Sequence, residues 1–555
     1  MDIASTSEDA LATYYSDILD STYDCTDRIV LNAYFPVGHS PAGFRHWWRN
    51  LHSGSDDDLD NNHLMRMAGR FRRRLNAYTE KEGIPIVDCT AGERKHELAE
   101  RYLPSEPEFR GVFLVLVSRA PAPVWDVVRG NNGIVNIAHK KSLPYVNHYS
   151  FHIMDPDWGH ITIKICGHPP FPAQIILNGH EYVAAQTKKA GHPFTKEGNC
   201  FTEVTDAQAL AQVADTLCSK DAIGRLSQIC NRWIYSACLC FALSAEEREV
   251  SGFEYRFSIY QAEFSRNLLF HSGAQMDQVF DSLIDRNRSW MCIDRIKTIL
   301  GLKKRPNRKG KKTPRWEVLV ENPAYNLTIF KIHFGALTLK AYTKGEHVLR
   351  FEIIVNNVGK LGCGRVLDRF PEVISYLKGV MGRFLSTLSA IDAAFLSDAT
   401  WEQLPLPSQV GKTRVGGIDL QKPRLRTVTR AVIALAASPN GFTASQLADK
   451  VRSLSSDTGD YRPTHAAYDL KKLRGKQWVR TIQKSRRYEP TFEGLQSMAA
   501  VLTLHDKIIK PILAVGSSAT STQLKSIGMN LTLDSQRRGH RIKMNGYIIN
   551  FGLAV

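Results

Sequence analysis

The chain has 555 residues, 43% of them hydrophobic and 23% charged, and carries a formal net charge of +17. This length predicts two to four domains, and the composition excludes an intrinsically disordered chain. So large a positive excess attracts polyanions and favours nucleic acid as the partner; the alternative is attachment to ribosomes or an anionic membrane by charge alone.

The cysteines and the N-terminal residues indicate the cellular compartment in which the protein is expected. Ten cysteines are scattered without a CxxC pair, a pattern of reduced thiols rather than of a disulfide framework or a zinc site. The first residues, MDIASTSEDALATYY, are acidic and polar, unlike a secretory signal, and no run of about eighteen apolar residues predicts a membrane span. We expect a cytoplasmic protein with no membrane partner.

A mixed α/β module is predicted over residues 1–240. A strand at 84–88 precedes a helix whose start is marked by Thr90 and, three residues on, Glu93, as in a capping box. Arg94 and Lys95 at this helix start are candidate phosphate contacts, with an ordinary charged helix surface as the alternative. Further along, the Asn178-Gly179 pair between apolar segments predicts a hairpin turn.

The segment from 146 to 182 is rich in histidine and aspartate. An acid-then-lysine order, as in metal nucleases, is suggested by DPD before ITIK, but Thr162 stands where the acid is needed, two residues before Lys164. Structural histidines and turn aspartates are the favoured interpretation; stacking of aromatic residues on unpaired bases is the alternative. The metal-capable residues are His148, His152, Asp155, Asp157, His160, His168, His180 and Glu181.

A central antiparallel-sheet domain is predicted over 241–396, and its register can be argued from LTIFKIHF-GA-LTLKAYTK-GEH-VLRFEIIV at 327–355. A two-residue turn at 335–336 and a three-residue loop at 345–347 place every apolar residue of the meander on one face. This register sets Tyr342 opposite Arg350 and Lys340 opposite Glu352. The polar face collects Lys331, His333, Lys340, Tyr342, Arg350 and Glu352.

A tyrosine between cations and beside a carboxylate can serve as a phosphodiester nucleophile, because the cations lower its pKa while a carboxylate ligates a divalent metal. LKAYTKG followed by LRFE resembles the replication initiators of filamentous phages and rolling-circle plasmids. The resemblance implies that Tyr342 is the nicking tyrosine, with Lys344 on the scissile phosphate and Glu352 near the metal, Mg²⁺ or Mn²⁺. Arg350, which flanks the tyrosine, is a further catalytic candidate, and His333 on the same face is a further candidate metal ligand.

One feature of those initiators is missing. Many carry two histidines separated by one apolar residue, whereas the nearest pair here, His148 and His152, would lie about 13 Å apart on a strand. The alternative for the polar face is a set of solvated cross-strand charge pairs, or a docking surface for nucleic acid.

A basic loop is predicted at 303–315, where KKRPNRKGKKTPR holds eight Lys or Arg and no acid. So many like charges cannot be buried, and the loop either clamps phosphates or has no specific role. The candidate contacts are Lys303, Lys304, Arg305, Arg308, Lys309, Lys311 and Lys312.

After a linker at 397–425, residues 426–510 read as three helices, a hairpin and a final helix, with Thr443 and Thr464 as caps of the second and third helices. This order resembles the winged-helix superfamily. Ala467, Leu470 and Leu473 are predicted to face the core. The nucleic-acid contacts implied are His465, Tyr468, Lys471, Lys472 and Arg474 on the third helix and Lys484, Arg486 and Arg487 on the wing. The alternative is a winged helix used for protein contact.

Blocks such as VNHYSFH–DPDWG, LNGHEY, KEGNCF and KAYTKG–LRFE also resemble a family of uncharacterised bacterial open reading frames, over most of residues 80–500. That resemblance implies no activity. We expect an α+β protein with a tail at 511–555, associated with a mobile element or phage, that binds DNA through the winged helix. Whether it also nicks DNA at Tyr342 is left open by the sequence. The alternative is a DNA- or RNA-binding regulator or ribonucleoprotein component without catalysis.

Overall fold

The computed structural model describes residues 10–90, 92–129, 135–290, 315–320, 328–394, 396–455, 460–483, 485–510, 529–533, 539–544 and 547–552. The chain divides into two compact units. Unit 1 is Met1–Arg288 with Ile293–Leu385, and unit 2 is Ser289–Cys292 with Ser386–Val555. Both combine helices with β-structure, and the predicted α+β class is confirmed.

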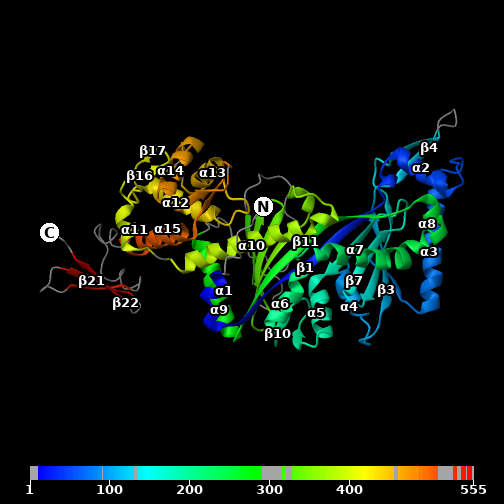
Figure 1. Cartoon of the computed structure of the whole chain (residues 1–555), viewed down its shortest axis with the longest axis horizontal. Helices are drawn as coiled ribbons and strands as arrows, with labels where there is room; N and C mark the ends of the chain where they lie inside the picture. The colour runs from blue at the N-terminus through cyan, green and yellow to red at the C-terminus, as the bar shows by residue number, and fades with distance from the viewer. Residues whose placement is uncertain are drawn as a thin grey trace. The chain divides into compact units, whose positions relative to one another are not determined.

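Unit 1 is built on one sheet of eleven strands in the order β12-β13-β14-β15-β11-β1-β8-β7-β6-β3-β2. Figure 1 labels four of them, β1, β3, β7 and β11. All neighbours are antiparallel except β2 and β3. In chain order the strands are β1 Leu19–Tyr34, β2 Ile86–Asp88, β3 Gly111–Pro121, β6 Tyr145–Asp155, β7 Gly159–Cys166, β8 Ala173–Asn178, β11 Arg256–Phe270, β12 Arg315–Val320, β13 Thr328–Phe334, β14 Leu337–Lys344 and β15 Val348–Val355.

Helices and small hairpins accompany this sheet. The helices are α1 Ala10–Tyr14, α2 Pro41–Leu51, α3 Asn61–Glu82, α4 Lys95–Glu100, α5 Gly179–Lys189, α6 Ala207–Asp215, α7 Asp221–Trp233, α8 Ala245–Ser251, α9 Gly273–Trp290 and α10 Phe370–Asp392. The hairpins are β4 Trp125–Arg129 with β5 Val135–His139, and β9 Phe194–Lys196 with β10 Phe201–Val204.

The two faces of the sheet differ because side chains alternate along each strand. One face is apolar: Tyr149 stacks on Phe71 of α3 at 4.6 Å between ring centroids, and Phe351 meets Phe384 of α10 at 6.2 Å. The other face carries the polar members of the same strands, among them Lys164, Glu352 and Arg350. Burial of the apolar face provides the core, so the polar face is left for other interactions.

The predicted boundary at residue 240 is wrong. β1 of the N-terminal segment pairs with β8 on one side and with β11 on the other, so both predicted modules contribute strands to one sheet. Residues far apart in sequence are neighbours here, and a boundary placed from local composition could not detect that pairing.

The predicted register of the meander is confirmed. Phe334 faces Leu337, Leu339 faces Ile353, Tyr342 faces Arg350 and Lys340 faces Glu352. The register follows from placing every apolar residue on the buried face, since a slip by one residue would expose all of them.

Two local predictions in unit 1 are wrong. Asn178-Gly179 does not form a hairpin turn: β8 runs straight into α5, and the Asn178 side chain accepts a hydrogen bond from the backbone N–H of His180 at 2.9 Å. The helix predicted from Thr90 begins at Lys95, because Gly92 has a φ of +97° and interrupts the backbone before it. Glu93 still accepts a hydrogen bond from the backbone N–H of Thr90 at 2.6 Å.

Unit 2 has the predicted order of three helices, a hairpin and a fourth helix. These elements are α12 Pro423–Leu435, α13 Ala444–Leu454, α14 Pro463–Gly475, β18 Val479–Thr481, β19 Tyr488–Pro490 and α15 Phe492–Leu504. Phe442 pairs with Tyr488 and adds a third extended segment to the hairpin. Beyond them lie three strands, β20 Met529–Leu533, β21 Gly539–Met544 and β22 Tyr547–Gly552.

The stretch at 397–425 is folded rather than a linker. It contains α11 Asp398–Gln403, β16 Ser408–Val410 and β17 Thr413–Val415, and Leu404 and Ile418 are buried in the core of unit 2. Proline and glycine occur in it because it turns repeatedly.

The third helix differs from its prediction in two details. It begins at Pro463, so Thr464 is inside it rather than its cap, whereas Thr443 caps α13 as predicted. Ala466, not Ala467, joins Leu470 and Leu473 in the core, since a spacing of four and then three follows the inner face of a helix. Across the described residues, every helix is too short or too polar to cross a membrane.

Candidate nucleic-acid interface and buried ionic network

The outer surface of α14 and the following hairpin is basic. Residues 462–487 contain nine Lys or Arg and a single acid, Asp469, which is fully buried. Its carboxylate accepts hydrogen bonds from the Tyr461 hydroxyl at 2.8 Å and from Arg424 at 3.1 Å. The acid therefore serves the core, and α14 itself presents no carboxylate on its surface, although Arg462 pairs with Asp460 and Arg480 with Glu489 beside it.

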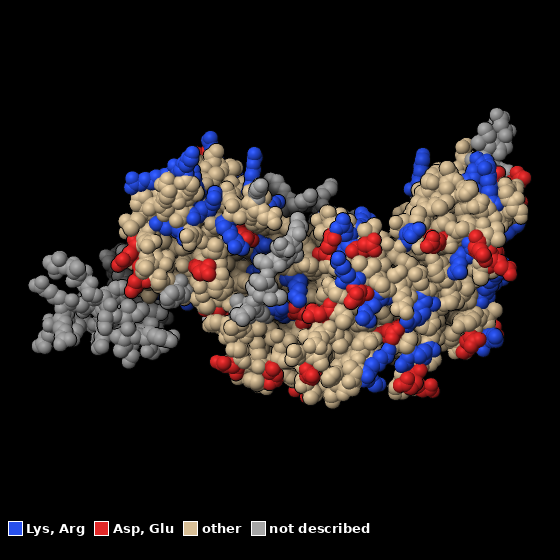
Figure 2. All heavy atoms as spheres, in the orientation of Figure 1, with Lys and Arg blue, Asp and Glu red and all other residues tan. Residues whose placement is uncertain are grey.

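The predicted contact residues of α14 lie on this surface. His465 and Tyr468 are exposed, and Lys471, Lys472 and Arg474 are half-buried. Lys472 lies over the Tyr468 ring, 5.1 Å from its centroid. None of the three basic residues forms an ion pair with a carboxylate in the part of the chain that the structure describes. Figure 2 shows Lys and Arg gathered along the top of this unit, where α12, α13 and α14 lie.

The hairpin extends the basic surface. Arg486 is exposed, and the guanidinium of Arg487 donates to the carbonyl of Gly441 at 3.2 Å. Lys484 and the basic loop residues Lys303, Lys304, Arg305, Arg308, Lys309, Lys311 and Lys312 lie outside the described residues.

The predicted catalytic residues lie in a buried ionic network, not on a solvated face. Asp27 reaches it through a β-bulge: two residues of β1, Asp27 and Arg28, stand opposite the single residue Glu263 of β11. The Asp27 carboxylate contacts Arg350 of β15 and lies 2.6 Å from Nδ1 of His180. Arg350 is fully buried, and its guanidinium also donates to the carbonyl of Asn199 at 2.6 Å.

Three further side chains complete the ionic network. Lys340 donates to Glu352 at 2.7 Å, and Glu352 lies 3.8 Å from the Arg350 guanidinium. Lys344 donates to the side-chain oxygen of Asn199 in the β9–β10 hairpin. The network therefore ties the hairpin and α5 to the polar face of the sheet.

Burial and charge set the protonation states in this ionic network. Burial raises the pKa of Asp27, but Arg350 and His180 outweigh it and hold that pKa well below its usual range. Burial lowers the pKa of His180, with Asp27 opposing. Burial, together with Glu352 and Asp27, raises the pKa of Glu263 to about 7.

The expectation that cations lower the pKa of Tyr342 is wrong. Burial raises this pKa far above its usual value, and Arg350 offsets only part of the effect while Glu352, Asp27 and Glu263 add to it. Arg350 and Lys344 are already engaged by Asp27 and Asn199, so neither is placed to hold a scissile phosphate. The geometry does not support a nucleophile at this position.

Glu352 and His333 do not fit a shared metal. They are separated by β14, which places them about 10 Å apart across two strand spacings, and the Nδ1 atom of His333 lies 3.0 Å from the Thr338 hydroxyl. Within the described ranges, no three His, Cys, Asp or Glu side chains are arranged to hold a metal ion.

Asp27, His180, Asn199 and Glu263 are members of the ionic network that the sequence analysis did not place beside Tyr342 and Arg350. Two of them belong to blocks named above: His180 to LNGHEY and Asn199 to KEGNCF. These blocks meet KAYTKG–LRFE in the ionic network, which accounts for three of the four blocks as parts of one site. Asp27 and Glu263 had no local signal, because a bulge and cross-strand pairing bring them in.

The VNHYSFH–DPDWG block lies at the other end of the sheet. Asp155 is buried, accepts from Arg232 and from the Trp233 indole at 2.7 Å each, and closes the turn by accepting from the backbone of Asp157. His152 meets His160 at 3.0 Å between ring nitrogens. These contacts assign structural roles to the turn aspartates, in agreement with the favoured interpretation.

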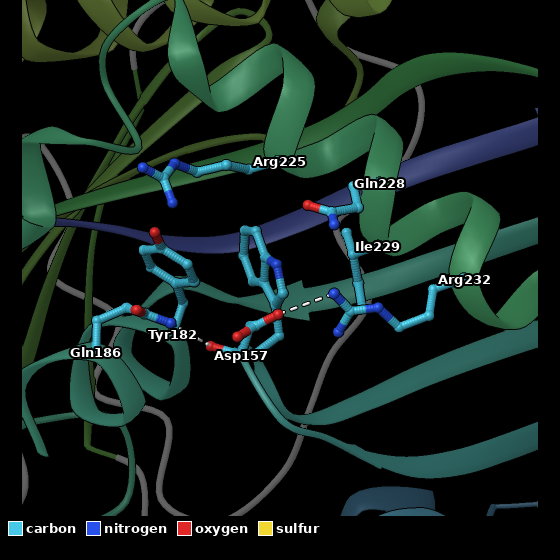
Figure 3. A pocket seen from close by; sticks show the side chains of 8 residues that line it. Asp157, Tyr182, Gln186, Arg225, Gln228, Ile229 and Arg232 are labelled. Atoms are coloured by element: carbon cyan, nitrogen blue, oxygen red, sulfur yellow. Dashed lines mark hydrogen bonds and ion pairs between the residues drawn. The ribbon is translucent and has the colours of Figure 1, made fainter. Parts of the chain in front are cut away.

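A pocket opens beside this turn, between α5 and α7 (Figure 3). Arg232 faces Asp157 at 2.9 Å, and Arg225 extends over the Tyr182 ring, 5.9 Å from its centroid. The lining residues are Asp157, Trp158, Tyr182, Gln186, Arg225, Gln228, Ile229 and Arg232.

Arg94 and Lys95, the predicted phosphate contacts, point to different partners. Arg94 is exposed and pairs with Glu97 at 2.7 Å, as an ordinary charged helix surface does. Lys95 instead reaches the polar face of the sheet and donates to the Ser118 hydroxyl at 2.6 Å.

Comparison of the chain with protein-family models, with curated proteins and with solved structures found no match.

Proposed function

We propose that this protein binds nucleic acid through unit 2, with α12–α15 acting as a winged-helix module and α14 as the helix that enters the major groove. The observation that carries the proposal is the charge of residues 462–487, which hold nine Lys or Arg and one acid, Asp469, whose side chain is buried. Lys and Arg on such a helix and its adjoining hairpin supply phosphate contacts, and His465 and Tyr468 supply groups for base edges.

In this proposal the protein binds nucleic acid and does not cleave it at Tyr342. The raised pKa of Tyr342 and the engagement of Arg350 by Asp27 support a structural ionic network rather than a nuclease site. This favours the regulator or ribonucleoprotein component over the nickase as the role of the chain.

The experiment compares two double variants of the full chain by fluorescence anisotropy on labelled duplex DNA and RNA. Lys471→Ala with Lys472→Ala is expected to weaken binding roughly tenfold or more, since each lost phosphate contact costs about 1 kcal/mol or more. The matched control is Lys507→Ala with Lys510→Ala, which removes the same charge from exposed residues after α15.

Equal loss in both variants would show that only overall charge matters, and it would overturn the assignment of α14. Absence of binding by the unmodified chain to any nucleic acid at low salt would leave the winged helix as a protein-contact module.

A further inference from the structure

Two lysines and a histidine meet on the polar face of the sheet, away from the ionic network around Arg350. Lys95 of α4 donates to the hydroxyl of Ser118 on β3, and Ser118 stands directly opposite His148 on β6. Ser150, two residues along β6, stands opposite Lys164 on β7. His148 and Lys164 are therefore diagonal neighbours on one face, a distance that long side chains span easily.

The two lysines have no carboxylate partner in the part of the chain that the structure describes. Yet their side chains and that of His148 are half-buried. Burial and the nearby Lys95 lower the pKa of Lys164. Burial, Lys164 and Lys95 lower the pKa of His148 to about 4, and no carboxylate opposes them.

Several other partly buried cations of unit 1 pair with carboxylates. Arg232 pairs with Asp155 and Asp157, Lys340 pairs with Glu352, and Arg266 pairs with Asp24 at 2.6 Å. Placing two like charges together in a half-buried site costs free energy that the fold does not recover by itself.

We propose that Lys95, Lys164 and His148 form a binding site for a dianionic phosphate group, such as that of a phosphate monoester. Two ammonium groups balance a charge of −2, and several phosphate oxygens can accept from both lysines and from the Ser118 hydroxyl at once. The site lies in unit 1 and stands independently of nucleic-acid binding by unit 2.

The test uses the full chain in phosphate-free buffer, with calorimetric titration and thermal unfolding in inorganic phosphate against chloride of equal ionic strength. Phosphate is expected to bind and to raise the unfolding temperature. Lys164→Met is expected to weaken phosphate binding tenfold or more. In phosphate-free buffer this variant is expected to be at least as stable as the unmodified chain, because the substitution removes the repulsion. Lys188→Met, at an exposed lysine of α5, is the matched control and should bind phosphate normally.

A second arm identifies the source of the phosphate. It uses an oligonucleotide with and without a 5′-phosphate, added to the variant with Lys471→Ala and Lys472→Ala, in which binding by unit 2 is weakened equally for both oligonucleotides. Displacement of inorganic phosphate by the 5′-phosphorylated strand alone would support a nucleic-acid end as the ligand, and binding of inorganic phosphate only would support a free phosphate. The site is overturned if phosphate has no effect beyond that of chloride, or if Lys164→Met binds phosphate as well as the control does.

Discussion

Asp27 and Arg350 form an ion pair in which both side chains are almost fully excluded from water. Removing one partner of such a pair leaves the other as an uncompensated buried charge, and this usually costs more than the pair contributes. We therefore predict that Asp27→Asn destabilises the protein by about 3 to 5 kcal/mol, measured by urea unfolding at pH 7.

The control for Asp27→Asn is Glu372→Gln, which breaks the exposed pair of Glu372 with Arg369. Surface pairs contribute little, so this change should alter stability by less than about 1 kcal/mol. Similar effects of the two substitutions would contradict the assignment of a buried, coupled site.

The raised pKa of Glu263 makes the stability of the folded protein depend on pH. Its pKa rises to about 7 on folding, so the folded state binds the proton more tightly than the unfolded state. The stabilisation that Glu263 gives the folded protein is fully present below the pKa that this carboxyl has in the unfolded chain. It is lost as the pH rises through the folded-state pKa of about 7. We predict that Glu263→Gln increases stability at pH 8 by up to about 3 kcal/mol and has little effect at pH 4.5.

Chemical unfolding of Glu263→Gln at the two pH values checks this prediction. Glu254→Gln, at an exposed side chain, is the control. An equal effect of Glu263→Gln at both pH values would show that Glu263 is ionised in the folded protein as in an ordinary surface carboxylate.

The chemistry of Tyr342 distinguishes a DNA nickase from a protein that only binds nucleic acid. Burial raises its pKa, so the phenolate that would attack a phosphodiester is disfavoured at neutral pH. We predict that neither the unmodified chain nor Tyr342→Phe nicks supercoiled or single-stranded DNA in Mg²⁺ or Mn²⁺. A covalent protein–DNA adduct that disappears in Tyr342→Phe would restore the nickase.

At the scale of elements, the junction of β8 and α5 depends on a glycine. A Cβ at residue 179 would lie 1.7 Å from the backbone carbonyl oxygen of Thr26, which cannot move without disturbing β1. Gly224, inside α7, has open space where a Cβ would lie. We predict that Gly179→Ala destabilises by about 3 kcal/mol or more, whereas Gly224→Ala stabilises by about 0.5 to 1 kcal/mol. Thermal unfolding of the two variants checks this, and a mild effect at Gly179 would mean that α5 does not pack as described.

The predictions that succeeded depended on local pattern. Alternation fixed the register of β13, β14 and β15, and helical spacing with Thr443 as a cap located α13. The boundary at 240 and the linker at 397–425 failed because cross-strand pairing and burial of Leu404 depend on residues distant in sequence. The Asn178-Gly179 pair failed because a tertiary contact with Thr26, rather than a turn, requires the glycine.

The candidate site was only partly predictable for the same reason. The sequence indicated that Tyr342, Arg350 and Glu352 share a face, but not that α5 and the β9–β10 hairpin bury them. The cations beside Tyr342 are visible in the sequence. The burial of its hydroxyl and the nearby carboxylates of Asp27 and Glu263, which raise its pKa, depend on the tertiary structure.

Across the whole molecule, the positive charge is uneven. Residues 396–510 hold nineteen Lys or Arg against ten Asp or Glu, so about a fifth of the chain carries nine of its seventeen net charges. The eight basic residues at 303–315 account for the remaining net charge. Charge concentrated in these two stretches favours binding of a polyanion at particular segments rather than diffuse attraction along the chain.

The most direct measurement is the salt dependence of nucleic-acid binding by the full chain, from about 50 to 300 mM KCl. We predict a linear fall of log K with log salt, and a slope reduced by about one to two in the Lys471→Ala, Lys472→Ala variant but unchanged in the Lys507→Ala, Lys510→Ala control. No binding at low salt, or a slope that both variants share with the unmodified chain, would contradict nucleic-acid binding through α14.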